Sequence, residues 1–507
     1  MLDVLTAEDV RRQDAACEAR GISTETLMGN AGFAVATAAR RLLDAAYGKR
    51  IVVACGKGNN AGDGLVAGRV LSAWGAAVTA VMLLGEDLSG AAGAALERFP
   101  GNRMGPEGFD REAARADLVI DAIFGVGLSR GPEGIVRDVI GRMAPPMRVL
   151  SIDVPSGLNA DTGAAAGEVV VRPALTVTLG GLKPGSLFDG SFQAGRVEIA
   201  EIGVPGDLRG GAALALEAAE IAALIPMRDP QTNKRRVGTV LVVAGSRAMP
   251  GAAALVAAAS VHSGAGLTTV AVPESVVPVI VSRVPEVTTI PLPETSEGTL
   301  DLKGIEQIRP RLAEFHAVAI GPGLSRHAAA VEAVQALTAE IEAPLVLDAD
   351  AISAFAGSPN TLAGRGRPLV LTPHAGELSR LMGTSVEEID GDRIAAARAA
   401  AAATRGHVLL KGTGTVVASN AGEMFINATG GSWLAQGGTG DVLTGVMAAL
   451  FAHDRARGRE GGGRLAAAAA WLHGRAGDLV AARVGPHPAS ASLLIDALPQ
   501  VLHEVAG

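Results

Sequence analysis

The sequence is poor in cysteine and in aromatic residues. Among its 507 residues are two cysteines, 10 phenylalanines, three tryptophans and one tyrosine. Two cysteines, Cys17 and Cys55, exclude a disulfide framework, and neither has a second Cys or a His at zinc-ligand spacing. Free thiols are typical of a reducing compartment. With so few aromatic side chains, Ala, Leu and Val must fill the helix cores.

Long apolar runs are also missing. The longest Ala-rich stretches, at 394–404 and 465–471, are too short to span a bilayer. The first residues, MLDVLTAEDVRRQ, have no basic region followed by an apolar stretch and no small-residue cleavage site, so we expect no secretory signal. These features predict a cytoplasmic protein without a membrane partner.

The charge balance is mildly acidic. Lys and Arg number 44 against 52 Asp and Glu, a formal net charge of −8, which argues against bulk nucleic-acid binding. Apolar residues make up 48% and charged residues 19%, enough for sizeable cores. At about 150 residues per domain the length suggests three domains or two large ones.

Short Val/Ile runs alternate with helical segments in both halves, which predicts mainly parallel sheets covered on both faces. The first half has expected strands at 50–55, 77–84, 117–121, 148–152 and 174–179, with helices at 64–75, 89–98 and 133–143. The second half has expected strands at 239–244, 267–272, 317–320, 344–348, 369–372 and 407–410, then an antiparallel pair at 414–418 and 423–426. Helices are expected near 439–452, 464–482 and 489–505, and the Gly/Pro-rich segment 203–236 is expected to be a linker.

The first expected strand ends in the segment GKGNNAGDG, residues 56–64. Glycine at a strand end permits a sharp turn and close approach of a ligand, and the next helix offers free N–H groups to an anion. The spacing matches neither GxGxxG nor a Walker A motif. Paired Asn and a nearby Asp suit polar groups such as a ribose or a carboxamide; a capped tight turn is the alternative.

Two further strand ends carry similar segments, DAIFGVGLSRG at 121–131 and DVPSGLN at 153–159. Carboxyl ends of parallel strands lie side by side, so Asn60, Asp121 and Ser156 are candidate oxygen ligands of one monovalent cation. Asp153 is the candidate general acid or base. For each Asp taken alone, a helix or turn cap is the alternative.

In the second half, GGTGD (437–441) lies at the mouth of an expected helix and KGTGT (411–415) follows a strand. Helix N–H groups at 439–441 would stabilise a transferring phosphoryl group, Asp441 would accept a proton from a hydroxyl, and Lys411 would contact phosphates. No Walker A motif is present, which argues against a P-loop kinase. Asp441 as an ordinary first-turn carboxylate, and His374 as a helix cap, are the alternatives. The segment 348–350 (DAD) faces the cleft through water or magnesium, or caps a helix.

The first-half segments GKGNNAGDG, DAIFGVGLSRG and DVPSGLNADTG resemble the NAD(P)H-hydrate epimerase family, the YjeF N-terminal domain, over about residues 1–215. One departure is Ala61, where the family usually has Gly. The resemblance implies a Rossmann-like domain in which Asp153 contacts the hydrate and supports interconversion of its R and S forms. It implies potassium (K+) on Asn60, Asp121 and Ser156. The implied hydrate contacts are Asn59, Asn60, Ala61, Gly62, Asp63, Gly125, Val126, Gly127, Leu128, Ser129, Arg130, Gly131 and Asp153.

The second half, about residues 225–507, resembles the ribokinase-like superfamily and within it the ADP/ATP-dependent NAD(P)H-hydrate dehydratases. The resemblance is carried by GAAALVAAASVHSGAGL, GPGL, LDADAI, TPHAGE, KGTGT and NATGGSWLAQGGTGDVLTG. It implies that Asp441 is catalytic and that a nucleotide, ADP with Mg2+, supplies the phosphoryl group. The implied hydrate contacts are Ala252, Gly323, His374 and Asp441, and the implied nucleotide contacts are Lys411, Gly412, Thr413, Gly414, Thr415 and Gly440.

Together the resemblances predict two doubly wound αβα domains in one repair enzyme. Hydrated NADH or NADPH would be epimerised by the first and dehydrated in the S form by the second, with ADP or ATP as partner. A homo-oligomer is expected. The alternative is a small-molecule kinase, acting on a hydroxymethylpyrimidine or a sugar, with a non-catalytic nucleotide-binding N-terminal domain.

Overall fold

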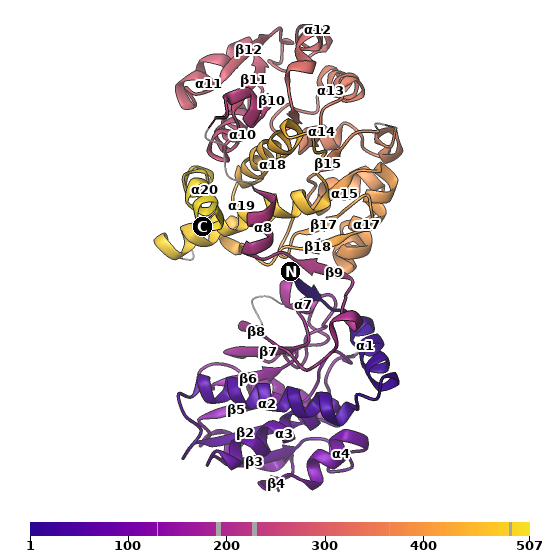
Figure 1. Cartoon of the computed structure of the whole chain (residues 1–507), viewed down its shortest axis with the longest axis vertical. Helices are drawn as coiled ribbons and strands as arrows, with labels where there is room; N and C mark the ends of the chain where they lie inside the picture. Colours follow the sequence, from indigo (N-terminus) through magenta and orange to yellow (C-terminus); the bar gives the residue numbers. More distant parts are fainter. Residues whose placement is uncertain (129, 189–193, 226–230, 365, 486–488, 507) are drawn as a thin grey trace. The chain divides into compact units, whose positions relative to one another are not determined.

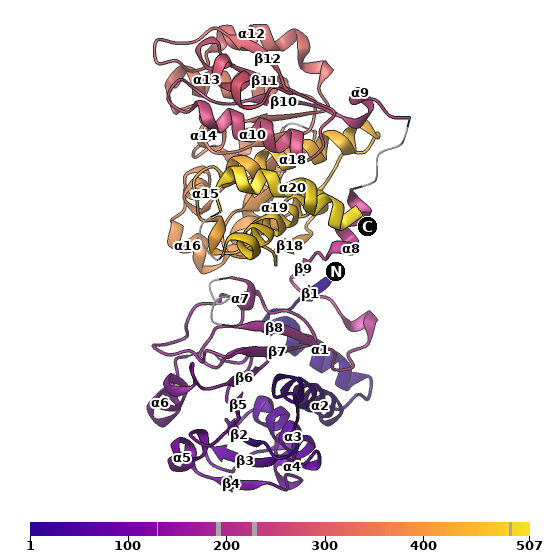
Figure 2. The ribbon, with the colours of Figure 1, turned by 90° about the vertical axis from the view of Figure 1, so that its left-hand side faces the viewer.

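The computed structural model describes residues 1–128, 130–188, 194–225, 231–364, 366–485 and 489–506 (Figures 1 and 2). The chain divides into two compact units, one formed by Leu2–Leu214 and the other by Ala215–Gly507 with Met1. Each unit contains a largely parallel sheet with helices, which confirms the predicted fold class of two αβα domains.

The first unit is built on one parallel sheet. Its strands lie in the order β4 (Asn102–Met104), β3 (Ala77–Met82), β2 (Arg50–Cys55), β5 (Leu118–Ala122), β6 (Val149–Ile152), β7 (Leu175–Leu179) and β8 (Arg196–Ala200). Alternate residues of β2 enter two different cores. Val53 packs with α2 (Thr24–Leu42), α3 (Asn59–Ala73) and α4 (Gly90–Glu97), whereas Val52 packs with α5 (Phe109–Ala113) and α6 (Gly134–Arg142).

The second unit has a mixed sheet. Its strands follow the order β18 (Met424–Ile426), β17 (Val416–Ala418), β16 (His407–Leu410), β15 (Leu369–Leu371), β14 (Leu345–Leu347), β13 (Ala317–Ile320), β10 (Thr239–Val243), β11 (Leu267–Pro273) and β12 (Thr288–Leu292). Pairing is parallel from β16 to β12 and antiparallel among β16, β17 and β18, as predicted. Against the strands pack α10 (Pro250–His262), α17 (Arg393–Thr404), α18 (Thr439–Ala456) and α19 (Gly463–Val484), and α20 (Ala491–Ala506) packs on α10 and α19.

Shorter or unpredicted elements complete the chain. The first unit has β1 (Leu2–Val4), α1 (Ala7–Ala19) and α7 (Pro184–Leu187), and the second has α11 (Val277–Arg283), α12 (Leu302–Ile308), α13 (Ala328–Glu340), α14 (Asp350–Ser353), α15 (Ala375–Met382) and α16 (Val386–Gly391). The segment 203–236 is not a plain linker, because it contains β9 (Ala213–Ala215), α8 (Ala218–Leu224) and α9 (Lys234–Val237). The described helices include none with the length and apolarity that a bilayer crossing requires.

Each sheet reverses its strand order at one point. From β2 the chain passes to β3 and β4 on one side and to β5 on the other, and from β10 it passes to β11 and β12 on one side and to β13 on the other. The loops that leave neighbouring strands there diverge, which opens a crevice at the carboxyl ends of the strands. These two switch points position the candidate sites.

Candidate active sites

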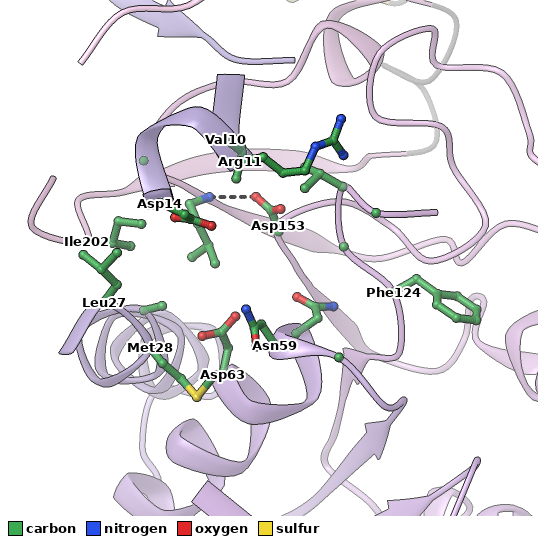
Figure 3. A pocket seen from close by; sticks show the side chains of 18 of the residues that line it. Val10, Arg11, Asp14, Leu27, Met28, Asn59, Asp63, Phe124, Asp153 and Ile202 are labelled. Carbon is green, nitrogen blue, oxygen red and sulfur yellow. Dashed lines mark hydrogen bonds between the residues drawn. The ribbon is translucent and has the colours of Figure 1, made fainter. Parts of the chain in front are cut away.

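A cavity of about 440 Å³ lies in the first unit at the carboxyl ends of β2, β5 and β6 (Figure 3). Residues of α1 and α2 close its other side. The sequence-predicted residues that line it are Asn59, Asn60, Asp63, Gly125, Val126, Gly127, Leu128 and Asp153. The three segments singled out from the sequence therefore meet at one place.

Other members of the predicted contact set lie elsewhere. Ala61 is fully buried in the core that α3 shares with the sheet, and a Cβ on Gly62 would lie 2.5 Å from the Met28 side chain. The helix begins at Asn59 rather than near 64, so the Asn-Asn-Ala-Gly-Asp segment is its first turn and only one face meets the cavity. Arg130 and Gly131 are not among the lining residues, and Ser129 lies outside the described residues.

Asp153 follows β6 in a left-handed backbone conformation, with φ of 68°. Its N–H donates to the carbonyl of Val177 at 2.7 Å, which holds the backbone in place. Its Oδ1 accepts hydrogen bonds from Lys183 Nζ at 2.7 Å and from Leu179 N–H at 3.1 Å. Its Oδ2 is 3.5 Å from the position that a Cβ on Gly125 would occupy, so this oxygen faces the cavity.

Lys183 was missed by the sequence reasoning. The residue is completely buried, and its Nζ also donates to the carbonyls of Leu179 and Gly181 and to Thr178 Oγ1, at 2.8, 3.1 and 3.2 Å. Burying an ammonium is unfavourable unless it is paired and hydrogen-bonded, and here both conditions hold. The only signal in the sequence was a lysine within GGLKPG, directly after an expected strand.

Two more carboxyl groups line the same cavity. Asp63, on α3, is 7% exposed, and its pKa is raised well above the usual value by burial and then by Asp153 and Asp14. Asp14, on α1, is more exposed, and its pKa is raised by burial and by Asp153, with Lys183 opposing. Figure 3 shows Asp63 and Asp153 on facing sides of the cavity.

Two of the three predicted cation ligands, Asp121 and Ser156, are hydrogen-bonded to each other in the structure. Asp121 is fully buried, and it accepts hydrogen bonds from Ser156 Oγ at 2.6 Å, Ser156 N–H at 2.9 Å and Ser151 Oγ at 2.8 Å. Burial raises its pKa in spite of these bonds. Asn60 lies beside Gly125, and its Nδ2 is buried without a hydrogen-bond partner in the structure as described. No group of three His, Cys, Asp or Glu able to hold a metal occurs among the described residues, so a cation here would rest on the amide, carboxylate and hydroxyl oxygens of Asn60, Asp121 and Ser156.

In the second unit, charged side chains gather at the carboxyl ends of β14, β15 and β16. Lys411 follows β16, and its Nζ pairs with Asp348 Oδ1 at 2.8 Å and with Glu377 Oε2 at 3.6 Å. Asp348 is 1% exposed, and its Oδ2 accepts a hydrogen bond from Thr444 Oγ1 at 2.7 Å. Thr444 belongs to α18, so this network ties the helix to the sheet.

Asp441 lies in the first turn of α18, next to that network. Burial raises its pKa to about 7, with Asp348 adding to the shift and Lys411 opposing it. Asp441 is a first-turn carboxylate, as the alternative held; the helix dipole favours its ionised form, whereas burial opposes it. A Cβ on Gly440 would lie 3.6 Å from Lys411 Nζ, which places the mouth of the helix beside the lysine.

His374 caps α15, as the alternative interpretation held. Its Nδ1 accepts a hydrogen bond from Gly376 N–H at 3.0 Å, and its Nε2 lies 3.5 Å from Glu377 Oε1. Its backbone also forms an isolated parallel bridge with Lys411, which keeps the exposed ring beside the charged network. Glu377 was not predicted; it is the third residue of this helix, in a capping box with His374.

The remaining predicted residues fall into two groups. Ala252 and Gly323 meet at the switch point, because a Cβ on Gly323 would lie 2.9 Å from the Ala252 Cβ. The segment Gly412, Thr413, Gly414 and Thr415 forms a turn after β16 in which Thr415 Oγ1 donates to the Gly412 carbonyl at 3.1 Å. Asp350 accepts a hydrogen bond from Ser325 N–H at 2.9 Å, so in the segment 348–350 it is Asp348 that faces Lys411.

His473, also unpredicted, supports α18 from α19. Its side chain is partly exposed, but desolvation of the ring lowers its pKa to about 4, so the ring is neutral near pH 7. Its Nε2 lies 2.9 Å from the carbonyl of Thr439, so the neutral ring donates a hydrogen bond there. This bond fixes the first turn of α18, which carries Asp441.

Comparison with known proteins accounts for both units. The family model NAD(P)H-hydrate dehydratase matches residues 240–500, and the model YjeF-related protein N-terminus matches residues 24–185. The bifunctional NAD(P)H-hydrate repair enzyme Nnr of Moorella thermoacetica is 39% identical over 502 residues, 96% of this chain and 93% of its own length. The enzyme of the same name from Thermofilum pendens is 38% identical over 500 residues, again 96% and 93%.

The chain belongs to the bifunctional NAD(P)H-hydrate repair enzymes. A solved structure, the ADP/ATP-dependent NAD(P)H-hydrate dehydratase of Bacillus subtilis co-crystallized with ATP/Mg2+, is 31% identical, with a TM-score of 0.49 over 58% of this chain and 99% of that one. Membership confirms the predicted fusion of an epimerase domain with a dehydratase domain acting in nicotinamide-nucleotide repair. The alternative of a small-molecule kinase with a non-catalytic first domain finds no support in these relatives.

Proposed function

We propose that the first-unit cavity interconverts the R and S forms of hydrated NADH and NADPH, and that the second-unit site dehydrates the S form with ADP. The products would be NAD(P)H, AMP and phosphate. We assign the epimerase to residues 1–215 and the dehydratase to 225–507. The observation that carries the proposal is the same in both units, an aspartate near a lysine at the carboxyl edge of a sheet: Asp153 with the fully buried Lys183, and Asp441 near the partly exposed Lys411.

Dehydration begins at the ring hydroxyl. Asp441 takes its proton while the oxygen attacks the terminal phosphoryl group of ADP and the bond to AMP breaks. Lys411 and the N–H groups at 439–441 offset the charge that develops on the phosphoryl oxygens. Phosphate then leaves the ring as the neighbouring carbon loses a proton, which restores the nicotinamide. Phosphate leaves far more readily than hydroxide, which is why the reaction consumes a nucleotide.

The dehydratase contacts follow from this arrangement. Ala252, Gly323, His374 and Asp441 would touch the hydrate, whereas residues 411–415 and Gly440 would hold the nucleotide. Mg2+ would enter with the ADP phosphates and lower their charge during transfer. Asp348 and Glu377 are the oxygen donors of this edge that suit such an ion, and both already contact Lys411.

For the epimerase we propose that Asp153 and the lining residues of 59–63 and 125–131 contact the hydrate. Asn60, Asp121 and Ser156 supply amide, carboxylate and hydroxyl oxygens, which fit K+, whereas the unpartnered Nδ2 of Asn60 is a hydrogen-bond donor for an oxygen of the hydrate. A bound K+ would supply positive charge for the polar groups of the hydrate. Asp153 and Asn60, on the two sides of Gly125, orient the ring.

The test uses the separated epimers of NADPH hydrate. The S form with ADP should give absorbance at the reduced-nicotinamide band together with AMP and phosphate, and parallel reactions with ATP decide the nucleotide. A stable phosphorylated product would instead show a kinase. The R form should be consumed faster with K+ than with Na+, and unchanged consumption by Asp153→Ala would overturn the epimerase site. We also propose a homo-oligomer in the cytoplasm; light scattering of the purified chain tests the first part.

A further inference from the structure

Inverting a carbon centre requires chemistry on both faces of the substrate ring. Asp153 supplies one side of the cavity through Oδ2. On α3, Asn60 and Asp63 are three residues apart, so they share one helix face, and both line the cavity. The Asn60 Oδ1 and the Asp153 Oδ2 each lie 3.5 Å from the position of a Cβ on Gly125. Asp63 therefore faces Asp153 across the space where a ring would fit, as Figure 3 shows.

We propose that Asp63 is the proton donor to the departing ring hydroxyl during epimerisation, with Asp153 as the proton acceptor on the opposite face. The proposal rests on the proposed epimerase function. It adds proton donation to the contact with the hydrate already proposed for Asp63. Asp63 is thus a catalytic residue, and Lys183, which touches only Asp153 and its neighbours, is a positioning residue.

The step is balanced as follows. The carboxyl of Asp63 gives its proton to the hydroxyl oxygen, the carbon–oxygen bond breaks, and water leaves while the ring nitrogen forms a double bond to that carbon. A water molecule then adds to the other face, and Asp153 Oδ2 takes one of its protons. The reverse direction uses the same groups with their roles exchanged, and solvent restores the two protonation states between turnovers.

Burial and contacts single out Asp63 among the charged groups that line the cavity, which are Arg11, Asp14, Lys57, Asp63, Asp153 and Lys183. Among the described residues the Asp63 side chain has no hydrogen bond and no ion pair, and burial, Asp153 and Asp14 raise its pKa, which favours the protonated form that donation requires. Lys183 has no exposed surface, and its ammonium faces Asp153 and three protein oxygens. Asp14 is more exposed, so its proton exchanges with solvent.

The experiment measures R-to-S conversion by the full chain, with the wild-type dehydratase activity on the S form as an internal control of folding. Asp63→Asn keeps the shape, but its amide cannot protonate the departing hydroxyl, and we expect kcat for epimerisation to fall at least 100-fold with KM changed less than threefold. Asp63→Glu should recover part of the rate. Asp138→Asn, the control, removes an exposed carboxylate of α6 that pairs with Arg137 outside the cavity, and it should stay within threefold of wild type.

The fate of the oxygen provides a second measurement. In water labelled with ¹⁸O, wild type should place one labelled oxygen in the epimer at each turnover, because the original hydroxyl leaves as water. Retention of the original oxygen would show that the ring opens instead, and would overturn the proposal. It would equally be overturned if Asp63→Asn raised KM at unchanged kcat, since Asp63 would then only bind. Absence of R-to-S conversion by wild type would refute the epimerase assignment itself.

Discussion

The two aspartates at the two sites have opposite electrostatic surroundings. Asp153 shares a 2.7 Å ion pair with Lys183, whose other contacts are uncharged oxygens. Lys411, whose charge acts on Asp441, lies 2.8 Å from Asp348 and 3.6 Å from Glu377. Lys183 thus pairs with one carboxylate and acts on Asp14 at longer range, whereas Lys411 pairs with two carboxylates and also acts on Asp441.

This difference predicts different chemistry from the same pair of residue types. The 2.7 Å ion pair with Lys183 holds the Asp153 carboxylate in position, so that its Oδ2 can accept a proton on one face of the ring. Burial raises the pKa of Asp441 to about 7, with Asp348 adding to the shift and Lys411 opposing it, so this carboxyl can gain and lose a proton near neutral pH. An aspartate near a lysine therefore does not indicate a single function, because the number of other carboxylates near the lysine differs between the two sites.

Replacing Asp441 should have the largest effect. We expect Asp441→Asn to lower the dehydratase kcat by about a thousandfold or more, because the ring hydroxyl loses its proton acceptor. R-to-S conversion should remain within twofold of wild type. Steady-state assays of both reactions on one preparation measure this. Asp350→Asn is the control, since that carboxylate bonds to Ser325 N–H outside the charged network; an equal loss in both variants would contradict the role of Asp441.

Breaking the ion pair between Lys183 and Asp153 should have the next largest effect. Lys183→Met leaves Asp153 buried without its cation, so epimerisation should fall about 100-fold, and the first unit should lose roughly 3–5 kcal/mol of unfolding free energy. The double variant Lys183→Met with Asp153→Asn should recover most of the stability and none of the activity. Denaturant titration and the R-to-S assay give both readouts. A double variant as unstable as the single one would show that Lys183 acts through packing alone.

The pH dependence of dehydration tests whether Asp348 raises the pKa of Asp441. Asp441 acts as a base, so only its ionised form is active, and a pKa of about 7 means that kcat/KM should fall tenfold for each pH unit below 7 and level off above it. Asp348→Asn removes a neighbour that raises this pKa, so the midpoint should move to lower pH. Dehydration rates from pH 5 to 9 measure the midpoint. A midpoint that stays fixed in the variant would contradict the electrostatic account.

The sequence predicted the strands better than the helices around them. The expected strands 317–320 and 407–410 coincide with β13 and β16, because each is a short apolar run closed by Gly or Lys-Gly. By contrast α1 and α2 were not predicted, although Thr6 with Asp9 and Ser23 are capping residues visible in the sequence. Their Ala-rich and polar composition gives a weak apolar period, so tertiary packing decides that they are helices: α2 is buried against the sheet, and Cys17 of α1 packs with Leu27 and Val204.

The site residues, too, were predicted only in part. Segments that follow strands were predicted to meet, since parallel strands end at one edge, and Asn60, Gly125 and Asp153 do line one cavity. The partners Lys183 and Asp348 were not predictable as partners. The Lys411–Asp348 pair is separated by 63 residues, and its existence depends on the positions of β14 and β16 on the two sides of β15 in the folded sheet.

A smaller effect should come from the support of Asp348. Thr444→Val removes the hydroxyl that donates to Asp348 Oδ2 at 2.7 Å and keeps the side-chain volume. A buried carboxylate oxygen left without this donor should cost about 1–3 kcal/mol of the second unit's unfolding free energy. Thermal unfolding of the variant, beside Thr444→Ser as the control that keeps the hydroxyl, measures this. Equal stability of the two variants would show that the bond contributes nothing.

The smallest change concerns Ala61, the position at which the sequence departs from the epimerase motif that it resembles. Its methyl is fully buried in the core behind the epimerase cavity, within the first turn of α3, and it does not line that cavity. Ala61→Gly should therefore cost about 1 kcal/mol through helix propensity and leave both kcat and KM for the R hydrate within twofold. Chemical denaturation and the epimerase assay test this together. A KM that falls several-fold would show instead that the methyl holds α3 away from the hydrate, so that Ala61 limits binding from behind the cavity wall.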